Sequence, residues 1–454
     1  MDGLFVLAHG LVGRSDLPIP EWLFGWAAAI VLIVSFVALA VLWPTPRLED
    51  GGFRPLPAAL GRVLTSRAVE ILCGAIGVFL LGLTIYAGFA GVQAATTNWA
   101  PTFIYVIVWV GLVPVSVLFG DVFRAFNPWR AIGRATGWLV GRFSGSTPAP
   151  LPYPERLGRW PAAIGLAAFA WMELVYSDGD SPEQLAIAAS VYTVLTCIGM
   201  ALYGVDRWID RGEAFSVYFG LFARISPFER RDRQIGLRRP LSGLGKLDPI
   251  PGTVPVLAVM IGGVTFDGAA EGDLWGSIAP ELTDFFGSLG LEPARAIEAA
   301  FTVGLIAAIL VVGGFYRLGM TGAKGVGGGF TTTDLARRFV HTLVPIAAAY
   351  VLAHYWTLLL YQGQAIGYLA VDPLGNDPNL ERTIDYGVIG ATAAWYWQVG
   401  FVVGGHCLAL ASAHDRALAL YRQAKLAVRS QYWMLVIMIG FTSLALWLLS
   451  QANA

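Results

Sequence analysis

Long apolar runs, separated by shorter polar stretches, dominate the chain from residue 22 to residue 450. A helix needs about 20 mostly apolar residues to cross the roughly 30 Å hydrocarbon core of a bilayer. The runs that meet this requirement are 22–43, 69–92, 102–120, 160–176, 185–204, 252–267, 296–316, 339–361, 394–413 and 432–450. The pattern predicts an all-α fold, an integral membrane bundle of about ten transmembrane helices that forms one polytopic domain over residues 1–454.

Composition agrees with this pattern. Apolar residues make up 56% of the chain and charged residues 13%, about half of the roughly 25% that is usual in soluble domains. The 16 Trp and 54 Gly also fit, because Trp gathers at lipid–water interfaces and Gly is common in membrane helices. These numbers disfavour a soluble enzyme, a disulfide scaffold and a disordered protein. We expect contact with the lipid bilayer and no binding of nucleic acid.

The positions of Lys and Arg predict the orientation, because loops that carry these residues stay on the cytoplasmic side. With ten spans and the N-terminus outside, all but three of the 30 Lys and Arg residues fall on one side. The exceptions are Arg14, Arg295 and Arg382. A wrong number of spans would scramble this separation. We therefore expect a multi-pass protein of the bacterial cytoplasmic (inner) membrane with both termini outside.

Four longer segments connect the predicted spans. Residues 121–158 and 206–250 are predicted to be cytoplasmic loops, and residues 268–293 and 362–393 extracytoplasmic loops. In the cytoplasmic pair, aromatic residues are interleaved with arginines, as Trp129 is with Arg130. This mixture is typical of amphipathic helices that lie in a membrane interface. The outer loops are long enough to fold over the outer mouth of the bundle.

Two neighbouring spans carry imidazoles, and ionisable groups within a membrane are costly and mark functional sites. In the eighth predicted span, His354 and Tyr361 are seven residues apart and share one helix face. The ninth contains His406, preceded by Gly400 and Gly404, a spacing that allows close helix approach. We expect these two helices to pack together, with His354 and His406 facing each other near the middle of the membrane.

Carboxylates at the outer ends of other spans complete the candidate site. Neutral imidazole and carboxylate bind divalent transition metals such as zinc, iron or copper, and a bound metal can activate water for hydrolysis. The predicted metal ligands are His354, His406 and Asp178. The residues expected to act in catalysis are Glu173, Asp267 and Tyr361. Together these residues would form a site that opens to the outside.

A haem cofactor is less favoured than a metal ion, because the histidines are poorly spaced for one. Two stacked haems need histidines on one face of each helix, whereas His341 and His354 are about 140° apart and His406 and His414 about 80°. A single haem between His354 and His406 needs equal depth, and their depths differ by ~7 Å. His9, in the outer N-terminal segment, is an optional further metal ligand.

Several short stretches carry a resemblance to a known family. They are AHGLVGR at 8–14, LPIPEW at 17–22, YQGQAIGY at 361–368, AHDRALALY at 413–421 and QYWM at 431–434. They resemble bacterial multi-pass membrane proteins labelled fenitrothion hydrolase, and the likeness runs from the first predicted span to the last. The resemblance implies hydrolysis of an organophosphate triester, with partner subunits on the extracytoplasmic side. It assigns no role to any residue.

Three functions stay open at this point, and whether the protein is an enzyme is not decided. The leading hypothesis is an outward-facing His, carboxylate and Tyr site, metal-dependent and hydrolytic as the resemblance implies. The second is a transporter or channel for a small solute or cation through the same groups. It requires a polar path to the inner face, where the spans carry few ionisable groups beyond Glu70. The third is a membrane scaffold for an extracytoplasmic partner.

Overall fold

The computed structural model describes residues 21–49, 51–144, 149–232, 234–421 and 423–452. The protein is nearly all-α, with about 73% of its residues in helices, which confirms the all-α character predicted from the apolar runs. His9, the optional metal ligand, lies outside the described residues, as do the first stretch of the family resemblance and residues 17–20 of the second.

Among the described residues, eight helical segments are long and apolar enough to cross a membrane. They are Gly25–Leu42, Arg67–Ala90, Trp99–Phe119, Pro182–Tyr203, Thr253–Ala270, Pro293–Lys324, Thr332–Val371 and Ala424–Leu448. The other two predicted spans are also helical. However, α8 (Trp160–Leu174) has only 15 residues, and α18 (Ala391–Leu420) is long but interrupted by polar groups such as His406 and Asp415. Eight of about ten predicted spans therefore have the length and composition of membrane helices.

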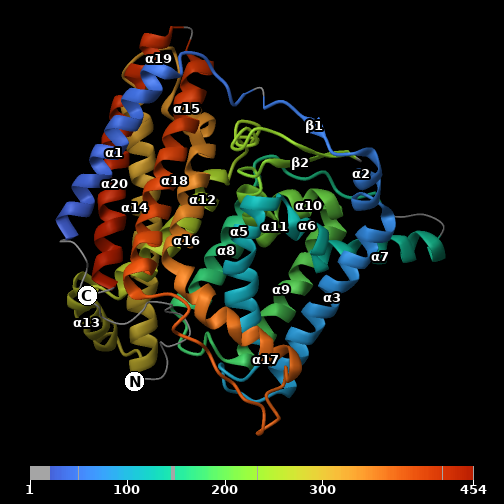
Figure 1. The fold of residues 1–454 in the computed structure, drawn as a ribbon. Helices are drawn as coiled ribbons and strands as arrows, with labels where there is room; N and C mark the ends of the chain where they lie inside the picture. The colour runs from blue at the N-terminus through green and yellow to red at the C-terminus, as the bar shows by residue number, and fades with distance from the viewer. Residues whose placement is uncertain (1–20, 50, 145–148, 233, 422, 453–454) are drawn as a thin grey trace.

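The helices form two groups that meet where α8 packs against α12 (Figure 1). The first group contains α1 (Glu21–Leu42), α12 (Thr253–Ala270), α14 (Pro293–Lys324), α15 (Thr332–Phe339), α16 (Leu343–Tyr361), α18 and α20 (Tyr432–Ala452). The second contains α3 (Arg67–Ala90), α5 (Leu112–Phe119), α6 (Val122–Phe126), α7 (Pro128–Ser144), α8, α9 (Pro182–Tyr203), α10 (Val205–Arg211) and α11 (Ala214–Phe222). The 3-10 segment η2 (Val340–Thr342) joins α15 to α16.

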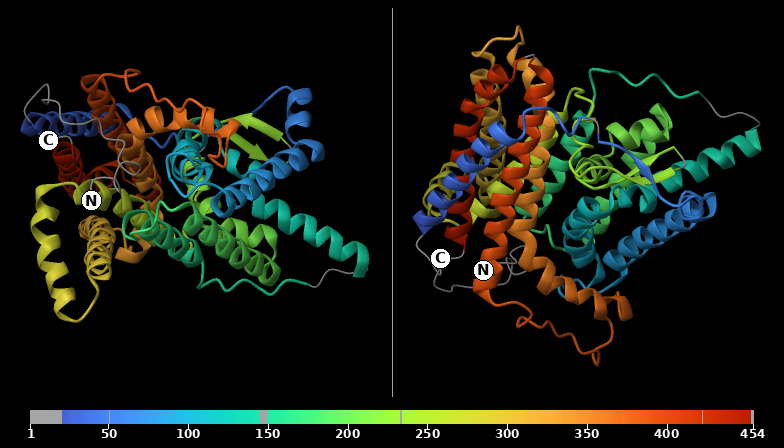
Figure 2. Two further views of the ribbon diagram at one scale, coloured as in Figure 1. Left: turned by 90° about the horizontal axis from the view of Figure 1, so that it is seen from below. Right: turned by 45° about the horizontal axis from the view of Figure 1, so that its top comes forward.

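Shorter elements mark the two ends of the molecule (Figure 1). At one end, here called the α13/α17 end, lie α13 (Asp273–Ser288), η3 (Gln362–Ala365) and α17 (Ile366–Val371). At the other, the α15/α19 end, lie α15 and α19 (Ala424–Ser430). Figure 2 shows α13 outside the bundle beside α14, and α7 projecting from the opposite side.

A small antiparallel sheet and a buried helix replace the interfacial helix that was predicted within residues 206–250. The sheet has the order β1-β3-β2 and is formed by β1 (Arg54–Pro55), β2 (Phe228–Arg231) and β3 (Gln234–Leu237). The short helix α2 (Ala58–Leu64) follows β1 and contacts β3. Seven of the nine residues of α11 are buried, and this helix packs against α5, α8 and α16. A helix that is apolar on all sides belongs in a protein interior, and charges such as Arg211 and Arg224 only flank α11.

The predicted contact between the eighth and ninth spans is present, but different glycines are involved. Helices α16 and α18 pack closely. A Cβ atom on Gly405 would come within 2.2 Å of the Ala349 Cβ and 2.9 Å of the Pro345 carbonyl oxygen. A Cβ on Gly400 or Gly404 would meet nothing within 4 Å. The prediction that Gly400 and Gly404 make the close approach is therefore wrong, because the helix phase turns Gly405 toward α16.

Two adjacent glycines allow a matched test of this packing. Gly405→Ala should lower the stability of the folded protein by about 1–3 kcal/mol, the usual effect of overpacking. Gly404→Ala should be neutral or stabilising by up to ~1 kcal/mol, because alanine favours the helix and its methyl group meets no neighbour. Thermal unfolding of both variants in detergent, followed by circular dichroism, provides the measurement. Equal midpoints for the two variants would contradict this packing.

Candidate functional site

The centre of the site is the carboxylate of Asp267, close to the end of α12. Its Oδ2 atom lies 2.8 Å from Nε2 of His354 and accepts a hydrogen bond of 2.6 Å from the hydroxyl of Tyr355. Asp267 and Tyr355 are 2% exposed and His354 is 6% exposed. A buried charge needs hydrogen-bonded partners, since an isolated one is strongly destabilising. Two consecutive residues of α16 therefore hold the carboxylate presented by α12.

The contact between Asp267 and His354 can hold one proton on either group. A carboxylate only accepts hydrogen bonds, whereas a protonated carboxyl or an imidazole N–H can donate one. At 2.8 Å the two heavy atoms are already at hydrogen-bond distance. Transfer of the proton between them would require little movement of either side chain.

Glu173, from the last turn of α8, borders a small cavity beside this cluster. The cavity has a volume of about 10 Å³, which is room for about one water molecule. Its lining residues are Trp109, Leu166, Ala170, Glu173, Leu174, Val259, Met260, Gly263, Val264 and Tyr355. The carboxylates of Glu173 and Asp267 are close enough to interact electrostatically. Tyr355 thus lies between the carboxylate to which it donates and the cavity that Glu173 borders.

An unusual helical segment forms part of the cavity wall. Between α4 (Trp99–Pro101) and α5, residues Thr102–Gly111 form a π-helix, η1. Such segments are rare and often lie at functional sites. Trp109 of η1 stacks on Tyr218 of α11, with ring centroids 4.3 Å apart. Within the described part of the chain, neither the Trp109 Nε1 nor the Tyr218 hydroxyl has a hydrogen-bond partner.

Tyr218 stays protonated beside Glu173. Burial, with a smaller contribution from the charge of Glu173, raises the pKa of Tyr218 well above its ordinary value. Its hydroxyl is thus a neutral, buried donor that lacks an acceptor among the described residues. Buried polar groups without partners are uncommon in proteins, so this position is suited to a transient contact.

A second buried carboxylate lies at the start of α11. Glu213 is fully buried and accepts hydrogen bonds from the backbone N–H groups of Phe215 and Ser216, which caps the helix. The Tyr192 hydroxyl donates to it at 2.6 Å and Asn127 Nδ2 at 3.0 Å. Burial raises the pKa of Glu213, although these donors offset part of that effect.

From Asn127 the polar contacts continue to the surface. Asn127 Oδ1 accepts a hydrogen bond of 2.7 Å from the Arg130 backbone N–H. The Arg130 guanidinium pairs with Glu70 at 2.7 Å, and Glu70 also pairs with Arg134. Arg134 contacts Asp206 at 3.3 Å, and their side chains are 41% and 63% exposed. The polar groups therefore reach an exposed, charged surface.

The predicted catalytic residues divide between the cluster and its surroundings. Glu173 and Asp267 lie in one region, as predicted. Tyr361 lies farther along α16, where its hydroxyl donates to the carbonyl of Ile389 at 2.9 Å and so ties α16 to the loop before α18. Asp178 is exposed in the loop that follows α8.

The predicted metal ligands do not come together. No group of three or more His, Cys, Asp or Glu residues in the described ranges could hold a metal ion. His354 is engaged by Asp267, whereas His406 contacts the Val402 carbonyl through Nδ1 and lines a different cavity. The helix phase that brings Gly405 against α16 places the next residue, His406, beside Tyr350 of α16 and in the wall of that cavity. The proposed set of His354, His406 and Asp178 therefore has no support in the described structure.

Sequence reasoning missed Glu213 and Tyr218, because the segment that contains them was assigned to the membrane interface. A usable signal was present. Residues 214–223 contain no charged residue, whereas an interfacial helix carries charges along one face. An uncharged segment that follows directly after a single acid therefore indicates a buried helix with a buried cap.

The hydrogen bond from Tyr355 to Asp267 can be tested by removing one hydroxyl. Tyr355→Phe should destabilise the protein by about 1–3 kcal/mol, because a buried carboxylate loses a donor. Tyr350→Phe, at a buried position of the same helix, should change stability by less than ~1 kcal/mol, since its hydroxyl makes only a long contact of 3.4 Å to Phe441. Denaturation in mixed micelles measures both effects, and a larger loss for Tyr350→Phe would refute the assignment.

Similarity to known proteins gives no further guidance about this site. Comparisons with protein-family models, with curated proteins and with solved structures find no match. What the protein does is therefore inferred from its own residues and their arrangement.

Proposed function

We propose that the protein is a multi-pass membrane protein that transfers protons along a buried line of polar side chains. The eight apolar helices, together with α8 and α18, would make the ten spans predicted from the sequence. The separation of Lys and Arg then favours an N-terminus outside the cell and the α15/α19 end in the cytoplasm. A bacterial cytoplasmic membrane is the location that this proposal assumes.

The observation that carries the proposal is the order of the buried groups. Asp267, His354 and Tyr355 lie nearest the α13/α17 end, and Glu173 borders the cavity beside them. Trp109, which also lines that cavity, stacks on Tyr218. Carboxylates, imidazoles and their partners inside membrane proteins commonly form proton relays. The arrangement thus has the chemistry of a relay at the predicted outer half of the bundle.

The second half of the line comes from α11. Tyr218 and Glu213 are five residues apart on this helix, about 7.5 Å along its axis. Glu213 connects through Asn127 to Arg130, which pairs with Glu70 at the charged surface. A transporter or channel needs a polar path to the inner face, and α11 supplies groups that the spans alone lack. This favours the second of the three functions left open by the sequence.

Metal-dependent hydrolysis, which the family resemblance implies, has less support. His354 is engaged by Asp267, and a triester substrate would not reach side chains that are only 2–6% exposed. A scaffold for an extracytoplasmic partner would leave the buried line without a purpose. We therefore propose proton transfer, alone or coupled to a small solute, in preference to either.

The first test is proton flux in proteoliposomes that enclose a pH-sensitive dye, driven by a potassium diffusion potential. Asp267→Asn should lower the flux at least about tenfold, because the amide cannot take up or release a proton in this range. Asp178→Asn, at an exposed carboxylate, should leave it unchanged. Equal flux through the wild type and Asp267→Asn would overturn the relay. Phosphotriester hydrolysis that is lost in His354→Ala would favour the enzyme instead.

The second test concerns the inner half of the line. Glu213→Gln keeps a side chain of the same shape with one accepting oxygen, yet it removes the titrating group. We expect a reduced flux with a preserved helical spectrum. The matched control is Glu298→Gln, since Glu298 is also buried at 6% exposure but pairs with Arg295 and Ser177 away from the line. Equal losses in both variants would contradict a specific path through Glu213.

A further inference from the structure

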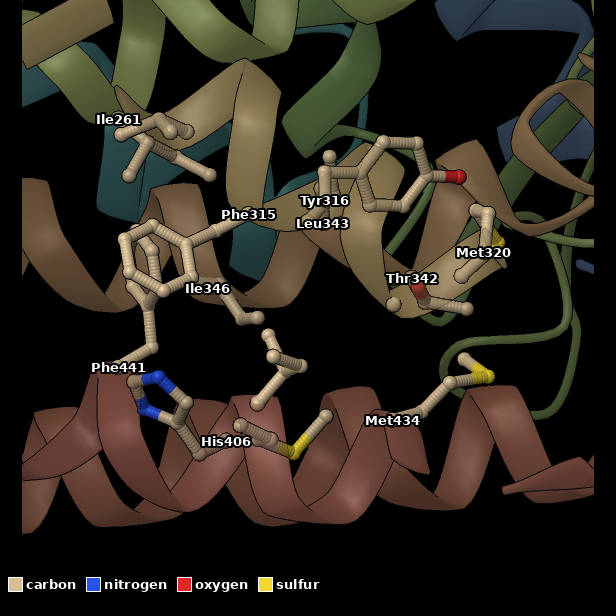
Figure 3. Close-up of a pocket in the computed structure, with 14 residues that line it drawn as sticks. Ile261, Phe315, Tyr316, Met320, Thr342, Leu343, Ile346, His406, Met434 and Phe441 are labelled. Carbon is tan, nitrogen blue, oxygen red and sulfur yellow. The ribbon is translucent and has the colours of Figure 1, made fainter. Parts of the chain in front are cut away.

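A second, separate cavity lies between α12, α14, α16, α18 and α20 (Figure 3). Its volume is about 70 Å³. Its lining residues are Ile261, Val312, Phe315, Tyr316, Gly319, Met320, Thr342, Leu343, Ile346, His406, Met434, Ile437, Met438 and Phe441. None of these residues belongs to the proposed proton line. The wall is apolar except for three side chains, those of Tyr316, Thr342 and His406.

The hydrogen bond of His406 determines which ring nitrogen carries no hydrogen. Its Nδ1 lies 2.8 Å from the carbonyl oxygen of Val402, and a carbonyl only accepts, so Nδ1 carries the hydrogen. His406 is completely buried in largely apolar surroundings, where an unpaired charge is strongly disfavoured. The ring is therefore neutral, and Nε2 presents a lone pair that can accept a hydrogen bond.

This lone pair is left without a donor. Within the described residues, His406 Nε2 has no hydrogen-bond partner. The other two polar groups of the wall are satisfied, because the Tyr316 hydroxyl donates to the Ala336 carbonyl at 2.6 Å and the Thr342 hydroxyl to the Phe339 carbonyl at 2.8 Å. In Figure 3 the imidazole projects from its helix toward Ile346 and Phe441 across the cavity. Among the side chains of the wall, His406 Nε2 is therefore the one acceptor without a partner, and neither hydroxyl has a hydrogen free to donate.

The shape of the cavity indicates what would occupy it. Phe315, at its edge, is 40% exposed and makes an edge-to-face contact with Phe441 of α20. Both α14 and α20 contribute to apolar segments long enough to cross a membrane, so an opening between them would face acyl chains. The volume is about half of the roughly 150 Å³ of an engineered cavity that binds benzene. A slim chain fits this space better than a ring.

We propose that this cavity binds a membrane-soluble alcohol. The hydroxyl would donate to Nε2 of His406, and the alkyl chain would extend past Phe315 toward the bilayer. A water molecule is a poorer occupant, because a buried water usually needs two to four polar partners and only one polar group in this largely apolar wall is unpartnered. The proposal does not depend on the proton line.

Dodecanol and dodecyl methyl ether form a matched pair of probes, because only the alcohol can donate a hydrogen bond. The experiment uses the full chain in phosphatidylcholine nanodiscs with ¹⁵N-labelled histidine, and the loss of one signal in His406→Leu assigns its Nε2 resonance. We expect dodecanol to shift this resonance in a saturable manner. The ether should bind at least about tenfold more weakly. No shift with the alcohol, or equal binding of both probes, would overturn the proposal.

A variant that keeps His406 tests the cavity itself. Gly319 lines the cavity and a Cβ added there would meet nothing within 4 Å, so Gly319→Leu should extend into the space from α14 and reduce dodecanol binding at least about tenfold. Gly314→Leu is the matched control, since Gly314 has equal room on the same helix but does not line the cavity. Unchanged binding in Gly319→Leu would place the alcohol elsewhere. Proton flux should persist in Gly319→Leu, because Gly319 is not part of the proton line, and this keeps the two proposals distinguishable.

Discussion

A carboxylate inside an apolar helix bundle has to find its hydrogen-bond donors within the protein, because no solvent is at hand to supply them. Asp267 meets this requirement through His354 and Tyr355, and the requirement fixes how α12 faces α16. Glu213 meets it through four donors at the start of α11. The positions of these two carboxylates thus constrain the helices around them as strongly as apolar packing does.

Helix α11, which packs against α16, brings the second carboxylate, Glu213, into the interior. Its apolar surface packs against α5, α8 and α16, and hydrophobic burial over a helix of this kind is the main gain from this packing. Tyr218 belongs to the same buried helix and stacks on Trp109. The packing of aromatic and aliphatic neighbours therefore positions these polar groups in the protein interior, where water does not supply their hydrogen bonds.

Much of the fold could be predicted from the sequence, because long apolar runs indicate helices directly. The site was harder. Glu173, Asp267 and His354 were predicted to lie in one region, since ionisable groups in spans are rare, but the partner of His354 was not. Gly405 makes the close backbone approach to α16, while His406 lies beside Tyr350 and lines a cavity that His354 does not border. No pattern along a single helix determines that phase. The short strands and α11 depended on contacts distant in sequence.

His354 and Tyr355 are consecutive residues, so they occupy one rigid turn of α16 while both reach the same oxygen of Asp267. A small twist of that turn about the helix axis would lengthen both hydrogen bonds together. The two contacts to Oδ2 would then be kept or lost together. The orientation of a single helix, α16, therefore controls both contacts at once.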